Sequence, residues 1–79
     1  MRLDKFLKVS RLIKRRTVAN EACDAGRVSV NGRPQKAGYE VKIGDVIAVS
    51  FGQKTVEAEV LDVQETVKKE NAGDLIRFL

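Results

Sequence analysis

A cluster of cationic side chains precedes a stretch with helical spacing. The cluster comprises Arg11, Lys14, Arg15 and Arg16, and Thr17 follows it as the expected N-cap of a helix over residues 18–25. A helix N-terminus carries unpaired backbone N–H groups and the positive end of the helix dipole, and guanidinium groups donate paired hydrogen bonds to phosphate. This junction therefore predicts a phosphate-binding site.

Other polar side chains can extend this site over one surface. Few aromatic residues are present and most fall on apolar periods, so a platform for base stacking is not expected. Arginine-rich recognition of backbone shape, as in folded RNA, suits the composition better. The expected RNA contacts are Lys5, Lys8, Arg11, Lys14, Arg15, Arg16, Arg27 and Arg33, with hydrogen bonds from Asn20 and Asn31.

The net charge of +4 is unevenly distributed along the chain. Residues 1–36 hold ten lysine or arginine residues and three acidic ones, a net charge of +7, whereas residues 37–79 hold five and eight, a net charge of −3. Such a distribution steers a polyanion onto one face. The alternative is that these charges are an ordinary solvated surface.

Catalysis is not expected from the residue types present. The chain has no histidine and one cysteine, Cys23, which falls at helical spacing with Ala19 and Ala22 and is predicted to be buried. Glu57 and Glu59 share one strand face but fit a solvated surface better than an acid pair. We therefore expect no enzymatic activity, no cofactor and no metal site.

The length of 79 residues indicates a single domain, residues 1–79. No apolar run approaches the roughly 18 to 20 residues of a membrane span, and the N-terminal residues are charged. A lone cysteine fits a reducing compartment. We expect a monomer located in the cytoplasm, with no membrane association.

Hydrophobic periodicity predicts two helices followed by strands. Leu3, Phe6 and Leu7 indicate a short amphipathic helix over residues 3–9, and Gly26 is placed to end the second helix in a left-handed conformation. From residue 27 the period changes to two, which is typical of strands. The predicted fold is of the α+β class, with two short N-terminal helices packed on a small, mostly antiparallel sheet of four or five strands.

The predicted strands are separated by turn residues. The Asn31-Gly32 pair favours a tight turn. The tail is ambiguous: residues 67–72 could form a helical turn, Gly73 a break, and residues 75–79 either helix or a closing strand whose apolar side chains dock on the core. The strands are expected at residues 28–30, 39–43, 46–51 and 56–60.

Several of these segments resemble one RNA-binding family. They are Arg2-Leu3-Asp4, Ser10-Arg11, Ala19, residues 26–32 (Gly-Arg-Val-Ser-Val-Asn-Gly), Val41 and Gly44-Asp45. In order and spacing they are similar to the domain named after small-subunit ribosomal protein S4, also called the alpha-L motif. The resemblance covers the core motif, residues 1–51, and leaves the C-terminal strand and hydrophobic tail, residues 52–79, outside it.

The resemblance implies a fold of two helices on a twisted antiparallel sheet and a non-catalytic role. Among free-standing domains of this length, the chain resembles the RqcP family of bacterial ribosome quality-control factors and, more distantly, the heat-shock protein fifteen family. The implied partners are large-subunit ribosomal RNA, tRNA and an elongating factor that adds alanine tails. Carried over by position, Arg2 and Arg16 would be the strongest phosphate contacts, with Arg27, Asn31 and Arg33 at the rim.

Two alternatives to a ribosome-associated RNA-binding module remain at this point. The chain could be a protein-interaction module whose apolar tail, residues 75–79, forms a dimer or partner contact and whose basic face is incidental. It could also bind small RNAs away from the ribosome. An enzyme-related role would require this to be the detached targeting domain of a pseudouridine synthase or a tRNA synthetase, families that carry the same motif.

Overall fold

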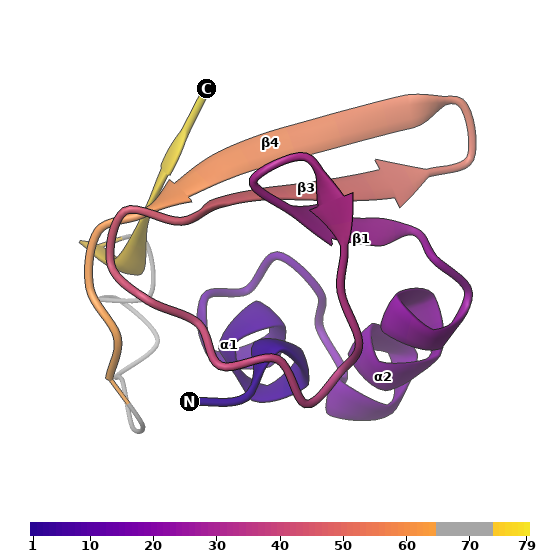
Figure 1. Cartoon of the computed structure of the whole chain (residues 1–79), viewed down its shortest axis with the longest axis horizontal. Helices are drawn as coiled ribbons and strands as arrows, with labels where there is room; N and C mark the ends of the chain where they lie inside the picture. Colours follow the sequence, from indigo (N-terminus) through magenta and orange to yellow (C-terminus); the bar gives the residue numbers. More distant parts are fainter. Residues whose placement is uncertain (65–73) are drawn as a thin grey trace.

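The computed structural model describes residues 1–64 and 74–79. Two helices, α1 (Leu3–Val9) and α2 (Arg16–Asp24), lie on one face of an antiparallel sheet (Figure 1). This arrangement confirms the predicted α+β class. Within the described residues the sheet has five strands in the order β2-β1-β3-β4-β5, namely β1 (Val28–Val30), β2 (Arg33–Pro34), β3 (Val46–Phe51), β4 (Lys54–Val60) and β5 (Ile76–Phe78).

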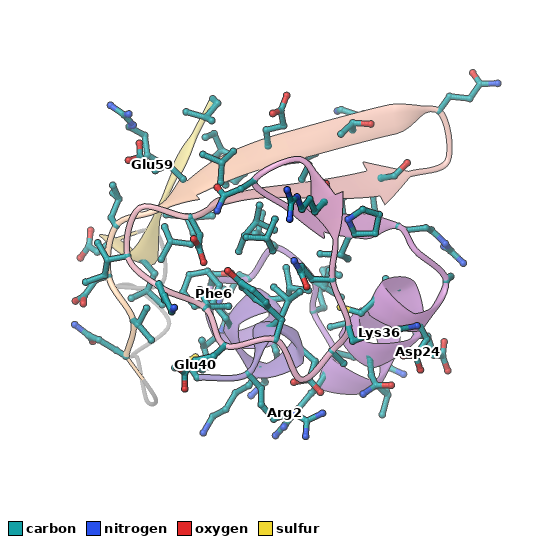
Figure 2. All side chains as sticks on the ribbon, in the orientation of Figure 1. Arg2, Phe6, Asp24, Lys36, Glu40 and Glu59 are labelled. Carbon is teal, nitrogen blue, oxygen red and sulfur yellow. The ribbon has the colours of Figure 1, made fainter. Side chains whose placement is uncertain are left out.

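The core forms between the helices and the inner face of the sheet. Leu3, Phe6 and Leu7 on α1 are fully buried, as their helical spacing predicts. Figure 2 shows Phe6 between α1 and the sheet. Ala19, Ala22 and Cys23 form the buried side of α2. Small side chains on α2 allow the two helices to approach closely, so α1 and α2 can present one continuous outer surface.

The start of α2 differs from the prediction. The helix begins at Arg16, and Arg15 is the N-cap residue, with an extended backbone and no capping hydrogen bond from its side chain. Thr17 is therefore not the N-cap. Arg16 lies in the first helical turn, where it contacts Asp4 of α1. Capping preferences describe only the local sequence, so they could not predict a helix start that involves a contact with another helix.

The end of α2 agrees with the prediction. Gly26 is left-handed, with a φ of 76°. Its N–H donates to the carbonyl of Cys23 at 3.0 Å, and the N–H of Arg27 donates to the carbonyl of Ala22 at 2.9 Å. These paired bonds satisfy the last carbonyls of the helix and turn the chain into β1.

The first hairpin follows directly from the turn sequence. Asn31 and Gly32 both have positive φ, 54° and 83°, and they join β1 to the short strand β2. A two-residue turn of this hand matches the twist of the strands it connects.

The predicted strand over residues 39–43 is wrong. This segment pairs with the N-terminus instead of the sheet: Leu3 N–H donates to the carbonyl of Tyr39 at 2.8 Å, and Val41 N–H donates to the carbonyl of Met1 at 2.9 Å. Among the described residues its β-pairing is an isolated bridge between Arg2 and Glu40. Alternating apolar residues favour an extended backbone, but they do not determine which neighbour it pairs with.

The C-terminal residues form a closing strand, which is one of the two structures that the sequence allowed for residues 75–79. β5 pairs antiparallel with β4, and Leu75 and Ile76 are buried. Phe78 and Leu79 remain 65% exposed, so the expectation that the whole tail docks on the core is wrong for these two residues. The helical turn expected at residues 67–72 and the break at Gly73 lie outside the described residues. Within the described residues, no helix has the length and hydropathy needed to cross a bilayer.

Candidate nucleic-acid interface

The carboxylate of Asp4 is the centre of the outer helical surface. Its side chain is 3% exposed, although it belongs to the first turn of α1. Its Oδ1 accepts hydrogen bonds from Arg2 Nε at 3.2 Å and from the backbone N–H of Lys5 at 2.8 Å. Its Oδ2 accepts from Asn20 Nδ2 at 3.3 Å and Arg2 Nη2 at 3.4 Å, and lies 3.4 Å from Arg16 Nε.

These contacts collect three of the predicted site residues in one place. Arg2 precedes α1, whereas Arg16 and Asn20 come from α2, so one buried carboxylate joins both helices. The side chains of Arg2 and Arg16 are 54% and 49% exposed. Figure 2 shows Arg2 on the side of the molecule away from the sheet. We call Arg2, Asp4, Arg16 and Asn20 the Asp4 cluster.

Hydrogen bonds favour the ionised form of Asp4 despite its burial. Burial by itself would raise the pKa of this carboxyl, but hydrogen bonds from Asn20, Arg2, Arg16 and the Lys5 N–H outweigh it and lower the pKa below its ordinary value. A buried carboxylate that stays charged can hold two guanidinium groups in a fixed orientation. Arg16 approaches Asp4 through Nε, and its side chain is half-exposed, so its guanidinium group can meet an anion.

A broad cavity of about 390 Å³ opens beside the Asp4 cluster. Thr17 and Glu21 complete its walls, together with Asp4, Arg16 and Asn20. The surface around the start of α2 is therefore concave, and no side chain caps the N–H groups of the first turn of that helix. The lining of this cavity contains one cation, Arg16, and two carboxylates. The positive charge available to a rounded polyanion such as folded RNA therefore comes from the half-exposed guanidinium groups of Arg2 and Arg16.

Three other predicted residues meet at the far end of α1. Lys8, Arg11 and Lys14, together with Val9, line a smaller pocket of about 120 Å³. Lys8 lies in the last turn of α1, and the other two belong to the loop that leads to α2. This second group, called the loop pocket below, is formed by the end of α1 and the loop that joins α1 to α2.

Not all predicted residues join these two groups. Lys5 is half-buried on α1, and Arg15 is exposed at the N-cap of α2. Arg27 and Arg33 are exposed at the first hairpin, away from both groups in the sequence and on other elements. Their contact with RNA stays a prediction.

Asn31 has a different environment from the one expected for an RNA contact. Its Nδ2 donates to Asp45 Oδ1 at 3.0 Å, and its Oδ1 accepts from the N–H of Val46 at 3.0 Å. Asp45 Oδ2 in turn accepts from the Tyr39 hydroxyl and from the N–H of Lys42, both at 3.0 Å. Burial, followed by the hydrogen bond to Asp45 and its charge, raises the pKa of Tyr39. The side chain of Asn31 thus links the first hairpin to the residue 39–45 segment.

Sequence reasoning missed Asp4 as a member of the site. The sequence does indicate the role of Asp4, because this acidic residue lies next to Leu3 and three residues before Leu7, on the apolar side of a basic helix. A carboxylate on a buried face requires cationic or N–H partners. The nearest cations on each helix, Arg2 and Arg16, supply them.

Cys23 belongs to the hydrophobic core and is poorly suited to nucleophilic chemistry. Its side chain is buried, as predicted. Burial, together with the negative charges of Asp4 and Asp24, raises the pKa of the thiol to about 11. The thiolate needed for nucleophilic or metal chemistry is therefore disfavoured. Within the described residues, no group of three or more metal-ligating side chains is placed to hold an ion.

Comparison with known proteins identifies the helical surface as part of a known domain. The family model of the S4 domain matches residues 1–47, which contain the Asp4 cluster and the loop pocket. The chain belongs to the S4 domain family. The predicted resemblance is thereby confirmed for the segment that contains the interface.

Individual proteins similar to this S4 domain match over most of its length. It is 61% identical over 75 residues to the RQC P-site tRNA stabilizing factor of Halalkalibacterium halodurans, covering 95% of this chain and 85% of that protein. Identity to the Bacillus subtilis protein of the same name is 56% over 79 residues, covering 100% of this chain and 92% of that protein. The trimeric structure of Vibrio cholerae Heat Shock Protein 15 has a TM-score of 0.91 at 28% identity, covering 100% of this chain and 81% of that chain.

Proposed function

We propose that this S4 domain is a non-catalytic RNA-binding protein that binds large-subunit ribosomal RNA and tRNA. The observation that carries the proposal is the Asp4 cluster, in which one buried carboxylate orients two half-exposed guanidinium groups on the outer helical surface. Relatives at 61% and 56% identity that are named RQC P-site tRNA stabilizing factors support it.

In this proposal binding proceeds by positioning, and no covalent bond is made or broken. Arg2 and Arg16 donate paired hydrogen bonds to phosphate oxygens, while Lys5 and Arg15 add charge nearby. Because the guanidinium groups are held by Asp4 before binding, less side-chain entropy is lost on contact with RNA. In this proposal Arg27 and Arg33, which are exposed at the first hairpin, contact RNA at the rim.

The proposed setting is the rescue of stalled large subunits that still carry peptidyl-tRNA. The domain, residues 1–79, would act as a cytoplasmic monomer that bridges ribosomal RNA and the tRNA, holding the tRNA in the peptidyl site while a partner adds alanine residues to the nascent chain. The name shared by the two relatives supports the tRNA-stabilising part of this role.

Sedimentation of a bacterial lysate containing tagged protein tests this proposal. We expect the protein to comigrate with free large subunits, more strongly when stalled peptidyl-tRNA is present. The Arg2→Ala/Arg16→Ala variant should leave that fraction, and the Lys54→Gln variant should remain in it, because Lys54 lies at the start of β4 on the far hairpin. Protein that stays at the top of the gradient under both conditions would contradict association with the ribosome.

One observation favours a second candidate function, a protein-interaction module. Phe78 and Leu79 are 65% exposed at the end of β5, which is an edge of the sheet. Exposed apolar side chains at a sheet edge are typical of partner contacts. If a Phe78→Ser/Leu79→Ser variant left the large-subunit fraction while the Arg2→Ala/Arg16→Ala variant remained there, the protein-interaction function would be preferred. Binding to small RNAs without ribosomes would favour the other alternative.

A further inference from the structure

The backbone of the loop between the helices contains an unusual residue. Arg11 has a φ of 64°, in the left-handed region. It directly follows Ser10, the C-cap residue of α1, and its N–H donates to the carbonyl of Lys8 at 3.1 Å. Glycine is preferred at this position because a Cβ atom is sterically disfavoured in the left-handed region. A left-handed arginine therefore carries a conformational cost, which persists only because the surrounding loop holds this conformation.

The loop around Arg11 is held firmly by the core. The buried side chain of Ile13 anchors it, and the N–H of Ile13 donates to the carbonyl of Leu7 at 3.1 Å. Ser10 is also buried, and its N–H donates to the carbonyl of Phe6 at 2.9 Å. These bonds also satisfy the last carbonyls of α1, which would otherwise repel an anion. The backbone positions of the loop pocket are thus fixed before any ligand binds.

The charge of the loop pocket is uncompensated. Lys8, Arg11 and Lys14 line it, and its fourth lining residue is Val9. Within the described residues none of the three cations forms an ion pair, in contrast to Arg2 and Arg16, which share Asp4. The pocket of about 120 Å³ admits several water-sized groups, enough for a phosphate group with part of its hydration.

We propose that the loop pocket is a phosphate-binding subsite that takes one backbone phosphate of RNA, separately from the Asp4 cluster, and that the left-handed Arg11 places its guanidinium there at the expense of fold stability. The inference rests on the proposed RNA-binding function. It assigns different roles to the two groups of cations. The Asp4 cluster presents oriented guanidinium donors, whereas the loop pocket supplies concentrated positive charge for one anion.

The Arg11→Gly variant tests this inference because its two expected effects have opposite signs. Glycine relieves the left-handed conformation, so the melting temperature should rise by about 2 to 5 °C. Affinity for fluorescently labelled unfractionated tRNA should fall about tenfold, since a charge-assisted contact to phosphate is lost. The variants Lys8→Gln and Lys14→Gln should each lower the slope of log affinity against log salt by roughly 0.7 to 0.9. Lys54→Gln serves as the control for charge loss and should leave affinity unchanged.

A second measurement addresses the pocket without RNA. Titration of the 15N-labelled protein with inorganic phosphate should give saturable amide shifts centred on residues 10–14, and these should be absent from Arg11→Gly. The inference is overturned if wild-type protein binds tRNA but the three pocket variants bind it equally well, or if phosphate causes no saturable shifts in this loop. Loss of tRNA binding by the wild type would instead contradict the proposed function, while saturable phosphate shifts would still support the pocket.

Discussion

Arg16 on α2 and Asp4 on α1 meet across the helix pair, with Arg16 Nε 3.4 Å from Asp4 Oδ2. The carboxylate also binds Arg2, so the acidic residue unites two cations that are fourteen positions apart in the sequence. Three charges in this arrangement leave a net charge of +1, which is less than the loop pocket carries. The value of the Asp4 cluster for RNA binding therefore lies in orientation more than in charge.

Replacement of Asp4 by asparagine separates orientation from charge. Asp4→Asn makes the surface more positive, which by itself would strengthen RNA binding. We expect the opposite, roughly tenfold weaker binding of tRNA. In the wild type Asp4 already holds Arg2 and Arg16, whereas in the variant both side chains would lose conformational freedom only on contact with RNA. The free energy of unfolding should also fall by about 1 to 3 kcal/mol. Fluorescence anisotropy and urea unfolding measure the two effects.

Glu57→Gln is the matched control for Asp4→Asn. It removes the same charge from an exposed position on β4, outside both cation groups. Its tRNA affinity should stay equal to that of the wild type or rise slightly. If Asp4→Asn bound tRNA more tightly than the wild type, as a simple charge effect requires, orientation by Asp4 would be excluded.

The pH dependence of stability provides an independent test of the Asp4 cluster. Because the pKa of Asp4 in the folded protein lies below the ordinary value of 3.8, the folded state binds this proton less readily than the unfolded state. The stabilisation is fully present above about pH 5 and is lost as the pH falls through the folded pKa. The difference in the free energy of unfolding between wild type and Asp4→Asn should therefore shrink on acidification. A difference that stays constant from about pH 6 to about pH 3 would show that ionised Asp4 contributes nothing.

Asn31 should prove important for stability, with little effect on RNA binding. Asn31→Gly keeps the left-handed backbone but removes the hydrogen bonds to Asp45 and from Val46 N–H. We expect a loss of about 1 to 2 kcal/mol in the free energy of unfolding and tRNA affinity within about twofold of the wild type. Unchanged stability combined with clearly weaker binding would instead identify Asn31 as an RNA contact at the rim.

Much of the fold could be predicted from local residue patterns. The apolar spacing of Leu3, Phe6 and Leu7 was sufficient to locate α1, because only a helix places all three side chains on one face that can be buried. Gly26 and the Asn31-Gly32 pair located two chain reversals, because few other residues accept a positive φ. These are local rules of backbone and burial, and they hold without knowledge of the partner segments.

The features that depend on distant partners could not be predicted in the same way. The segment from Tyr39 to Ile43 has the alternation of a strand, yet its backbone pairs with residues 1–3. The edge of the sheet is formed by Arg33–Pro34 instead. The Asp4 cluster depends on a contact between two helices. Arg11 adopts a left-handed backbone conformation that arginine disfavours. The conformational preference of arginine therefore gave no reason to expect this conformation at position 11.

The most direct test of the proposed function measures affinity for purified large ribosomal subunits that carry tRNA in the peptidyl site. The Arg2→Lys/Arg16→Lys variant keeps both charges but loses the planar guanidinium groups, so we expect at least about tenfold weaker binding than wild type. Lys54→Gln should bind as the wild type does, and melting curves should show all three proteins folded. Equal affinity of the double lysine variant and the wild type would contradict recognition by guanidinium groups oriented on Asp4.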